Sequence, residues 1–415
     1  MSSPPRRGAA RWALLSLAIG SFGIGMTEFV VMGLLPDIAQ DLLPATWSAS
    51  QDDAIAQAGW LITLYALGVV VGAPTIAGLV ARHPRHRVMI GLALALTVGN
   101  ALTLVMPTFE LVAASRFVAG LPHGAYFGIG ALVAADVLGP GKRAKGVAFV
   151  LTGLTVANVA GVPLGTFLGQ QAGWRAAFLV VAAIFAVATI AIAFSVPRHA
   201  GDPGRTFRAE LKVFRIGQVW FALAIGSVGF GGFFAVYSYV APMVTELTGS
   251  PAWVVPIVLM LMGVGMMIGN IIGGHLADVD LKRSLLGGLI ALAVVLILVA
   301  LTAQWIWTLG LFVFLTGLVS SVLVPTIQTR LMDVAEDNQS IAAAVNHSSL
   351  NLGNSIGAFV GGTVIAAGWG FTAPAWAGVL LAVGGVLLAA VSLSLERRRV
   401  AAGRGAARLP HRLGG

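Results

Sequence analysis

The sequence of 415 residues contains no cysteine, and only 10% of its residues are charged. Without cysteine the chain has no disulfide framework, no thiolate metal site and no cysteine nucleophile. Soluble domains carry roughly 25% charged residues, so this chain has too few charges to cover a water-soluble body of its length. These shortages exclude soluble enzymes, disordered proteins and fibrous proteins as classes.

Motifs of chemical catalysis are also missing from the sequence. There is no phosphate loop of the G-x-x-x-x-G-K-[ST] type, no histidine or carboxylate cluster with metal-ligand spacing, and no G-x-S-x-G elbow. We therefore expect no enzyme activity, no metal, no cofactor and no use of ATP as an energy source.

Long apolar runs fill most of the chain, and 58% of the residues are hydrophobic. A helix needs about 20 mostly apolar residues to cross a bilayer. Twelve stretches meet this need, and the first is too long for a cleaved signal peptide. The predicted spans are residues 12–36, 57–80, 88–106, 109–138, 146–169, 175–196, 218–243, 253–276, 284–303, 305–332, 340–367 and 371–395.

Basic residues gather on one side of this twelve-span arrangement. They precede the first span, follow the second, fourth, sixth and eighth spans, and fill the tail. Cytoplasmic loops carry the excess of lysine and arginine, so both termini are expected in the cytoplasm. The net charge of +9 follows from this topology and from anchoring near anionic lipid, and no nucleic-acid partner is expected. The opposite loops hold Asp37, Asp41, Asp52, Asp53, Glu110 and Glu246.

A polar interruption at residues 197–217 divides the spans into six plus six. It predicts an N-terminal six-helix bundle (1–196), a cytoplasmic linker (197–217), a C-terminal six-helix bundle (218–395) and a basic cytoplasmic tail (396–415). The sequence GLVARHPRHR after the second span is echoed by GHLADVDLKR after the eighth. Internal repeats of this kind are common in secondary transporters, which bind substrate between the repeats near the midplane. The predicted fold class is an all-α membrane protein with twelve transmembrane helices in two pseudo-symmetric halves.

Glycines spaced four residues apart on the second, fifth, eighth and eleventh spans predict close helix approach. The fifth span also reads GLTVANVAGVPLGTFLG, the fourth RFVAGLPHG, and the first ends in MTEFVVMGLLPDIAQDL. Together with GWRAAF and the basic loop after the second span, these motifs resemble the major facilitator superfamily. Within it, they resemble drug:proton antiporters of the twelve-span type, above all bacterial chloramphenicol exporters and arabinose-efflux-permease-like proteins.

The resemblance covers about residues 12–395 and carries several implications. It places the second, fifth, eighth and eleventh spans between the halves, and it implies a monomer in the bacterial inner membrane. The sequence departs from the family where Arg82 replaces the loop aspartate and Pro84 replaces a glycine. Asp136 would pair with Arg82 or Arg85 at an inner gate; alternatively, it is only a solvated residue at the end of a helix. The gating candidates are Arg82, Arg85, Asp136 and Asp278.

Two opposite charges lie deep in predicted spans. Glu28 is about 12 Å from the outer end of the first span, and Arg116 is about 10.5 Å from the outer end of the fourth. A charge in hydrocarbon costs at least ~2.5–3.5 kcal/mol, so both residues are functional candidates. We expect them to lie near each other, either as a proton-coupling pair or as a static ion pair that fixes the helices.

Two further residues are proton-coupling candidates. His123 follows Arg116 by two helical turns on nearly the same face, and histidine titrates near neutral pH. His123 would relay a proton or bind substrate; the alternative is a hydrogen-bonded packing residue. Asp37 ends the first span, where it would take up protons from outside or serve only as a solvated loop acid.

Candidate substrate-binding residues are aromatic, methionine or polar side chains at helical spacing. The eleventh span carries a polar stripe, which either lines a cavity or forms hydrogen bonds to neighbouring helices. The seventh span carries an aromatic stripe, which either lines a cavity or packs against neighbouring helices or lipid. An adaptable apolar pocket would draw on such residues. The candidates are Met26, Tyr126, Phe127, Phe230, Phe233, Phe234, Tyr237, His347 and Asn351.

The function expected from these features is proton-coupled efflux of small apolar or amphipathic molecules by alternating access, with chloramphenicol-like drugs as the leading substrates. The alternatives are an efflux permease for a sugar or another metabolite, and an uncoupled facilitator. A receptor without transport activity is disfavoured, because the chain has no sizeable soluble domain to carry a signal.

Overall fold

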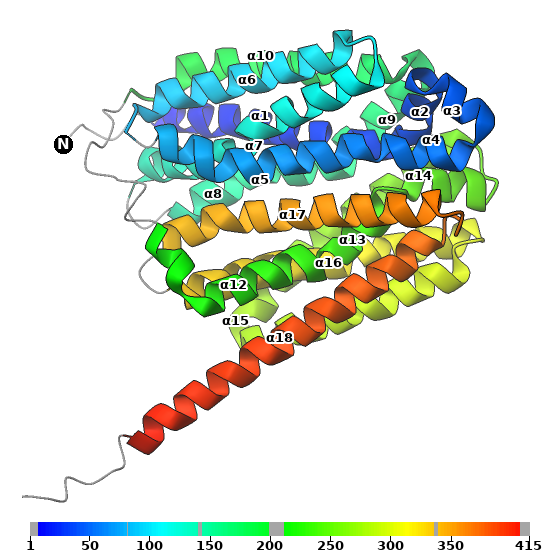
Figure 1. Ribbon diagram of the computed structural model, residues 1–415. Coiled ribbons are helices and arrows are strands. Elements are labelled where there is room, and N and C mark those ends of the chain that lie inside the picture. The colour runs from blue at the N-terminus through cyan, green and yellow to red at the C-terminus, as the bar shows by residue number, and fades with distance from the viewer. Residues whose placement is uncertain (1–6, 81, 140–142, 199–210, 336–338, 407–415) are drawn as a thin grey trace, which may run out of the picture.

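The computed structural model describes residues 7–80, 82–139, 143–198, 211–335 and 339–406. Within these ranges all regular structure is helical, without any strand. Figure 1 shows long, roughly parallel helices in two groups, an N-terminal half coloured from blue through cyan to bluish green and a C-terminal half coloured from green to red. Most of the predicted linker 197–217 and the end of the predicted tail 396–415 lie outside the described residues.

The N-terminal half begins with one long helix and continues through short helices at its far end. Its elements are α1 (Arg7–Gly33), α2 (Leu35–Leu42), α3 (Pro44–Ala49), α4 (Gln51–Ala58), α5 (Trp60–Val80), α6 (Arg85–Val105), α7 (Phe109–Leu138), α8 (Arg143–Val156), η1 (Ala157–Gly161), α9 (Val162–Ala172) and α10 (Trp174–Ser195).

The C-terminal half has a broken first helix followed by long ones. Its elements are η2 (Leu211–Arg215), α12 (Gly217–Ala224), η3 (Ile225–Gly229), α13 (Gly231–Tyr237), α14 (Val240–Pro242), η4 (Met243–Leu247), η5 (Ala252–Val254), α15 (Val255–Thr302), α16 (Ile306–Val334), α17 (Gln339–Ala366) and α18 (Ala373–Ala406).

Ten helical segments in the described residues are long and apolar enough to cross a membrane, against twelve spans predicted. The difference has two causes. The predicted eighth and ninth spans are continuous in α15, whose 48 residues bend at Asp280, where φ is −154° and ψ is 93°. The predicted eleventh span is α17, whose buried asparagines and serines lower its hydropathy. Counted as helical passes, the structure therefore still has two groups of six.

Proline explains two of the breaks within predicted spans. Pro36 lies in the first turn of α2. It has no N–H to donate to the Met32 carbonyl, and in a continuous helix its ring would clash with that carbonyl, which ends the first span early. Pro163 offers no N–H for an intrahelical hydrogen bond, and the π-helical turn η1 directly precedes it. The seventh span, predicted as one run, is divided by η3 and by the turn at Ser238.

The two halves meet where α5 packs against α17 and where α15 packs against η1 and α9, and α5 and α17 run side by side in Figure 1. These are the second, eleventh, eighth and fifth spans. The glycine rows, however, pack mainly within each half. A Cβ on Gly68 would lie 2.2 Å from the carbonyl oxygen of Phe117 on α7, and one on Gly269 would lie 2.0 Å from that of Leu318 on α16.

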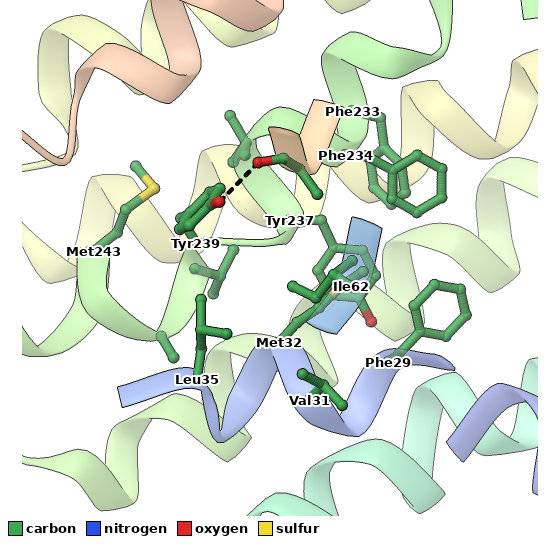
Figure 2. Close-up of a cluster of buried hydrophobic side chains, with 14 of the residues drawn as sticks. Phe29, Val31, Met32, Leu35, Ile62, Phe233, Phe234, Tyr237, Tyr239 and Met243 are labelled. Carbon is green, nitrogen blue, oxygen red and sulfur yellow. Dashed lines mark hydrogen bonds between the residues drawn. The ribbon is translucent and has the colours of Figure 1, made fainter. Parts of the chain in front are cut away.

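We call the end of the bundle with Arg82, Arg85, Lys282 and Arg283 the basic end, and the end with Asp37, Asp41 and Glu110 the acidic end. Near the acidic end the halves are joined by Gln170, whose Nε2 donates to the Ala252 carbonyl at 2.9 Å. Figure 2 shows one buried apolar cluster there, in which Phe29 and Met32 of α1 lie beside Phe234 and Tyr237 of α13. The halves are therefore closed together at the acidic end.

The deepest ring contact between the halves joins Phe127 of α7 to His347 of α17. The hydrogen bonds from Gln170 to Ala252 and from Asn354 to Glu28 lie between this ring pair and the acidic end. The closed zone thus runs from the acidic end to about the middle of the bundle.

Candidate functional site

Arg116 is fully buried on α7, with 0% of its surface exposed. Its two terminal nitrogens donate to Thr27, one to Oγ1 at 2.9 Å and one to the carbonyl oxygen at 2.7 Å. The guanidinium also lies over the Tyr65 ring, 4.2 Å from the centroid, and such a contact stabilises a desolvated cation. Thr27 in turn donates to Asn100 Oδ1. The hydrogen-bonded chain holds the buried charge in one place.

Glu28 is buried on α1 and reaches the other half of the protein. Its Oε1 accepts a hydrogen bond from Nδ2 of Asn354 on α17 at 3.1 Å. Glu28 and Arg116 interact electrostatically, but no ion pair joins them among the described residues. Thr27 and Glu28 are neighbours in sequence and so point about 100° apart around the helix. One therefore meets α7 and the other α17.

A row of rings continues from Arg116 toward the middle of the bundle. The Tyr65 hydroxyl and His123 Nδ1 are 3.1 Å apart, and the His123 and Phe127 ring centroids are 5.3 Å apart. Phe127 stacks on His347 across the halves, with centroids 5.1 Å apart and an angle of 5° between the planes. Arg116 and His123, which were predicted to share one helix face, both contact Tyr65.

The polar stripe on α17 faces the N-terminal half. Asn354 contacts Glu28, and His347 contacts Phe127. Asn351, between them, donates from Nδ2 to the His347 carbonyl at 3.0 Å. The sequence indicated the stripe but not its partner, since Glu28 is 326 residues away from Asn354 in the chain.

The remaining substrate-binding candidates lie in two different places. Met26 and Tyr126 belong to the packing within the N-terminal half, rather than to an interface pocket: Tyr126 donates from its hydroxyl to the Leu17 carbonyl at 3.0 Å. The α13 stripe is buried. From it, Tyr237 stacks on Phe29 of α1 with centroids 5.2 Å apart. The members of that stripe are Phe230, Phe233, Phe234 and Tyr237.

The gating candidates lie near the basic end. Arg85 of α6 forms an ion pair with Asp136 of α7, so this contact joins two helices of the same half. Arg82 and Asp278 are exposed, and neither forms an ion pair within the described residues. In the second half Glu396 instead forms ion pairs with Lys282 at 2.8 Å and with Arg330 at 2.9 Å.

Two acids at the acidic end differ in their surroundings. Asp37 is half-buried in the first turn of α2, and burial raises its pKa. Asp41 is more exposed; burial works to raise its pKa, but bonds from Trp174 and Arg175 outweigh that effect and lower it. The Trp174 indole nitrogen donates to Asp41 at 2.9 Å, and Arg175 forms an ion pair with it. Sequence reasoning did not single out this Asp41 contact.

Two bundles of long apolar helices, with the buried Glu28 hydrogen-bonded across their interface, are typical of a membrane transporter rather than of an enzyme. The chain belongs to the Major Facilitator Superfamily, whose family model matches residues 17–280 and 254–413. The fold class and superfamily predicted from the sequence are thereby confirmed.

Curated relatives align along nearly the whole chain. The inner membrane transport protein YdhP of Escherichia coli (strain K12) is 37% identical over 387 residues, covering 93% of this chain and 97% of that protein. The putative transporter AraJ of Escherichia coli (strain K12) is 33% identical over 372 residues, covering 89% and 91%. A chloramphenicol resistance protein of Streptomyces lividans is 31% identical over 385 residues, covering 91% and 95%.

A solved structure supports the fold. The bacterial homologue of the human lysosomal transporter Spinster, in an inward-facing and unoccupied conformation, aligns with a TM-score of 0.65. The identity is 16%, and the alignment covers 93% of this chain and 96% of that chain. At this identity the likeness bears on the fold alone.

Proposed function

We propose that the protein is a proton-coupled exporter of small apolar or amphipathic molecules that works by alternating access in the bacterial inner membrane. Its leading substrates are neutral amphipathic drugs of the chloramphenicol kind. The observation that carries the proposal is Glu28, a buried carboxylate held by Asn354 across the halves and close to Arg116. The name of the Streptomyces lividans relative supports the substrate class.

Glu28 suits proton coupling because its surroundings change when the halves move. In the closed arrangement Asn354 of the other half supplies its hydrogen bond, and that bond is lost when the halves separate. A buried carboxylate must be paired or protonated, while water solvates it once the interface opens. Proton binding and release by Glu28 would thereby accompany the alternation between the two states.

In the proposed orientation the basic end faces the cytoplasm, with both termini on that side. Lysine and arginine mark cytoplasmic loops, which supports this assignment. The closed acidic end would then face outward, so substrate would enter from the cytoplasm. His123 and Asp37 would carry protons to and from Glu28, and Arg85 with Asp136 would stabilise the inner gate.

The proton gradient is sufficient as an energy source for such export. One proton moving inward across ~100 mV supplies about 2.3 kcal/mol. Because 1.4 kcal/mol is a factor of ten in an equilibrium, one proton per molecule supports roughly a fifty-fold concentration ratio of a neutral substrate.

The test is drug accumulation and minimum inhibitory concentration in an efflux-deficient bacterium, with chloramphenicol first and a small drug panel beside it. We expect resistance from the intact protein that is lost with Glu28→Gln and with a protonophore. Glu110→Gln, which changes an exposed acid at the start of α7, is the matched control and should retain resistance. Resistance that survives Glu28→Gln would leave an exporter but refute the coupling site. No resistance despite confirmed expression would favour efflux of a sugar or another metabolite.

A further inference from the structure

Three side chains of α17 form a polar strip that we call the amide seam: His347, Asn351 and Asn354. Their spacing of four and three residues places them on one face of the helix. Both ends of the seam contact the N-terminal half, through the stack on Phe127 and through the hydrogen bond to Glu28. The face that carries the seam is therefore the face that meets the other half.

Asn351, at the centre of the seam, has an unused hydrogen-bond acceptor. The residue is 6% exposed, and its Nδ2 is taken by the His347 carbonyl. Its Oδ1 is buried and has no hydrogen-bond partner within the described part of the chain, and the same is true of Oδ1 of Asn354. Most buried side-chain polar atoms have a partner, and an exception calls for a reason. Two such acceptors on one face, one turn apart, suggest that a ligand supplies the missing donors.

The seam lies at a depth suited to a transported molecule. Asn351 is about 18 Å along α17 from Gln339, close to the middle of the 28-residue helix. Substrate sites of repeat-built transporters lie near the midplane between the repeats.

The rings beside Asn351 offer the second element of a binding site. Phe127 and His347 stack on each other across the halves, so any movement that separates the halves exposes one face of each ring. Flat molecules pack well against such faces. The Asn351 amide and the Phe127 ring carry no charge, so these contacts favour neither a cation nor an anion.

We infer that Asn351 is a specificity-determining residue whose Oδ1 accepts a hydrogen bond from a hydroxyl or amide N–H group of the transported molecule. The site thereby selects neutral ring compounds with hydrogen-bond donors, and the Phe127 and His347 rings pack against the ring of the substrate. This inference rests on the proposed export function.

The test compares two probes in proteoliposomes that contain the purified full chain. Chloramphenicol carries hydroxyl and amide N–H donors, whereas nile red is a neutral aromatic molecule without any donor. We expect Asn351→Leu to lower kcat/KM for chloramphenicol about tenfold, mainly through KM, since one substrate hydrogen bond is lost. Transport of nile red should change less than about twofold, and Asn351→Gln should restore part of the chloramphenicol transport.

Asn346→Leu is the matched control. Asn346 is on the same helix, 1% exposed and likewise unpaired at Oδ1, but it lies on another face. The Asn346→Leu substitution should change the transport of both probes to the same extent. Equal loss of both probes in Asn351→Leu, or loss of neither, would overturn the inference. Wild-type export of nile red without chloramphenicol would also overturn it while leaving an exporter. Export of neither probe would refute the drug-export function and the inference with it.

Discussion

Gly263 of α15 provides a direct way to change the closure of the acidic end. A Cβ at this position would lie 2.2 Å from the carbonyl oxygen of Asn158 in η1, on the other half. The clashing atom belongs to the backbone, so no side-chain rotation relieves it. Gly263→Ala should therefore push η1 and α15 apart by about 1 Å, since carbon and oxygen normally approach no closer than about 3.2–3.5 Å.

The expected magnitude follows from the cost of overpacking. Extra methyl groups in a well-packed site cost typically 1–3 kcal/mol, and 1.4 kcal/mol is a tenfold change in a population ratio. If the closed state is populated at about 99%, Gly263→Ala should leave about 90% or less. The acidic end should open correspondingly more often, because Gly263 lies only about 12 Å from the start of α15 at Val255.

Spin-label distance measurements can test this shift. The chain has no cysteine, so Gln57→Cys and Thr363→Cys create one label pair without background. The two positions line the same pocket near the acidic end, Gln57 on α4 and Thr363 on α17. The control is Gly274→Ala on the same helix, where an added Cβ has nothing within 4 Å. Equal distance distributions in the two alanine variants would refute the link between this contact and closure.

Two further predictions concern contacts at the acidic end. Asp41→Asn should remove a pH dependence of thermal stability, because the pKa of Asp41 is lowered in the folded protein. The ionised carboxylate stabilises the fold at pH values above its ordinary pKa of 3.8. This stabilisation is lost as the pH falls through the lower pKa of the folded protein. A thermal melting series in detergent measures this, and equal acid sensitivity of the variant and wild type would contradict it. Tyr239→Phe should lower stability by about 0.5–1.5 kcal/mol, because the buried hydroxyl donates to the Ala358 carbonyl at 2.7 Å; an unchanged melting temperature would contradict this.

Features that repeat along the chain were predictable from the sequence. Apolar runs gave the number of helical passes, and the depth of Glu28 and Arg116 placed both charges in the same layer of the N-terminal half. The apolar runs and the residue spacing both report position along a helix axis. They do so because rise per residue and apolar length depend only on local sequence.

Contacts around a helix and between distant segments were not predictable in the same way. The sequence suggested a direct pair of Glu28 and Arg116, but one residue of difference rotates Thr27 toward α7 and Glu28 toward α17. The partner Asn354 belongs to another half, and only the docking of the two halves brings it to Glu28. The glycine rows indicated close packing without indicating the partner, which is a helix of the same half in most cases.

The account depends most on proton coupling at Glu28. In proteoliposomes loaded with a pH-sensitive dye, chloramphenicol export should drive counter-movement of protons in the wild type and not in Glu28→Gln, while Glu110→Gln behaves as the wild type. Proton movement of equal size in wild type and Glu28→Gln would contradict the central claim that this buried carboxylate couples the proton to the substrate.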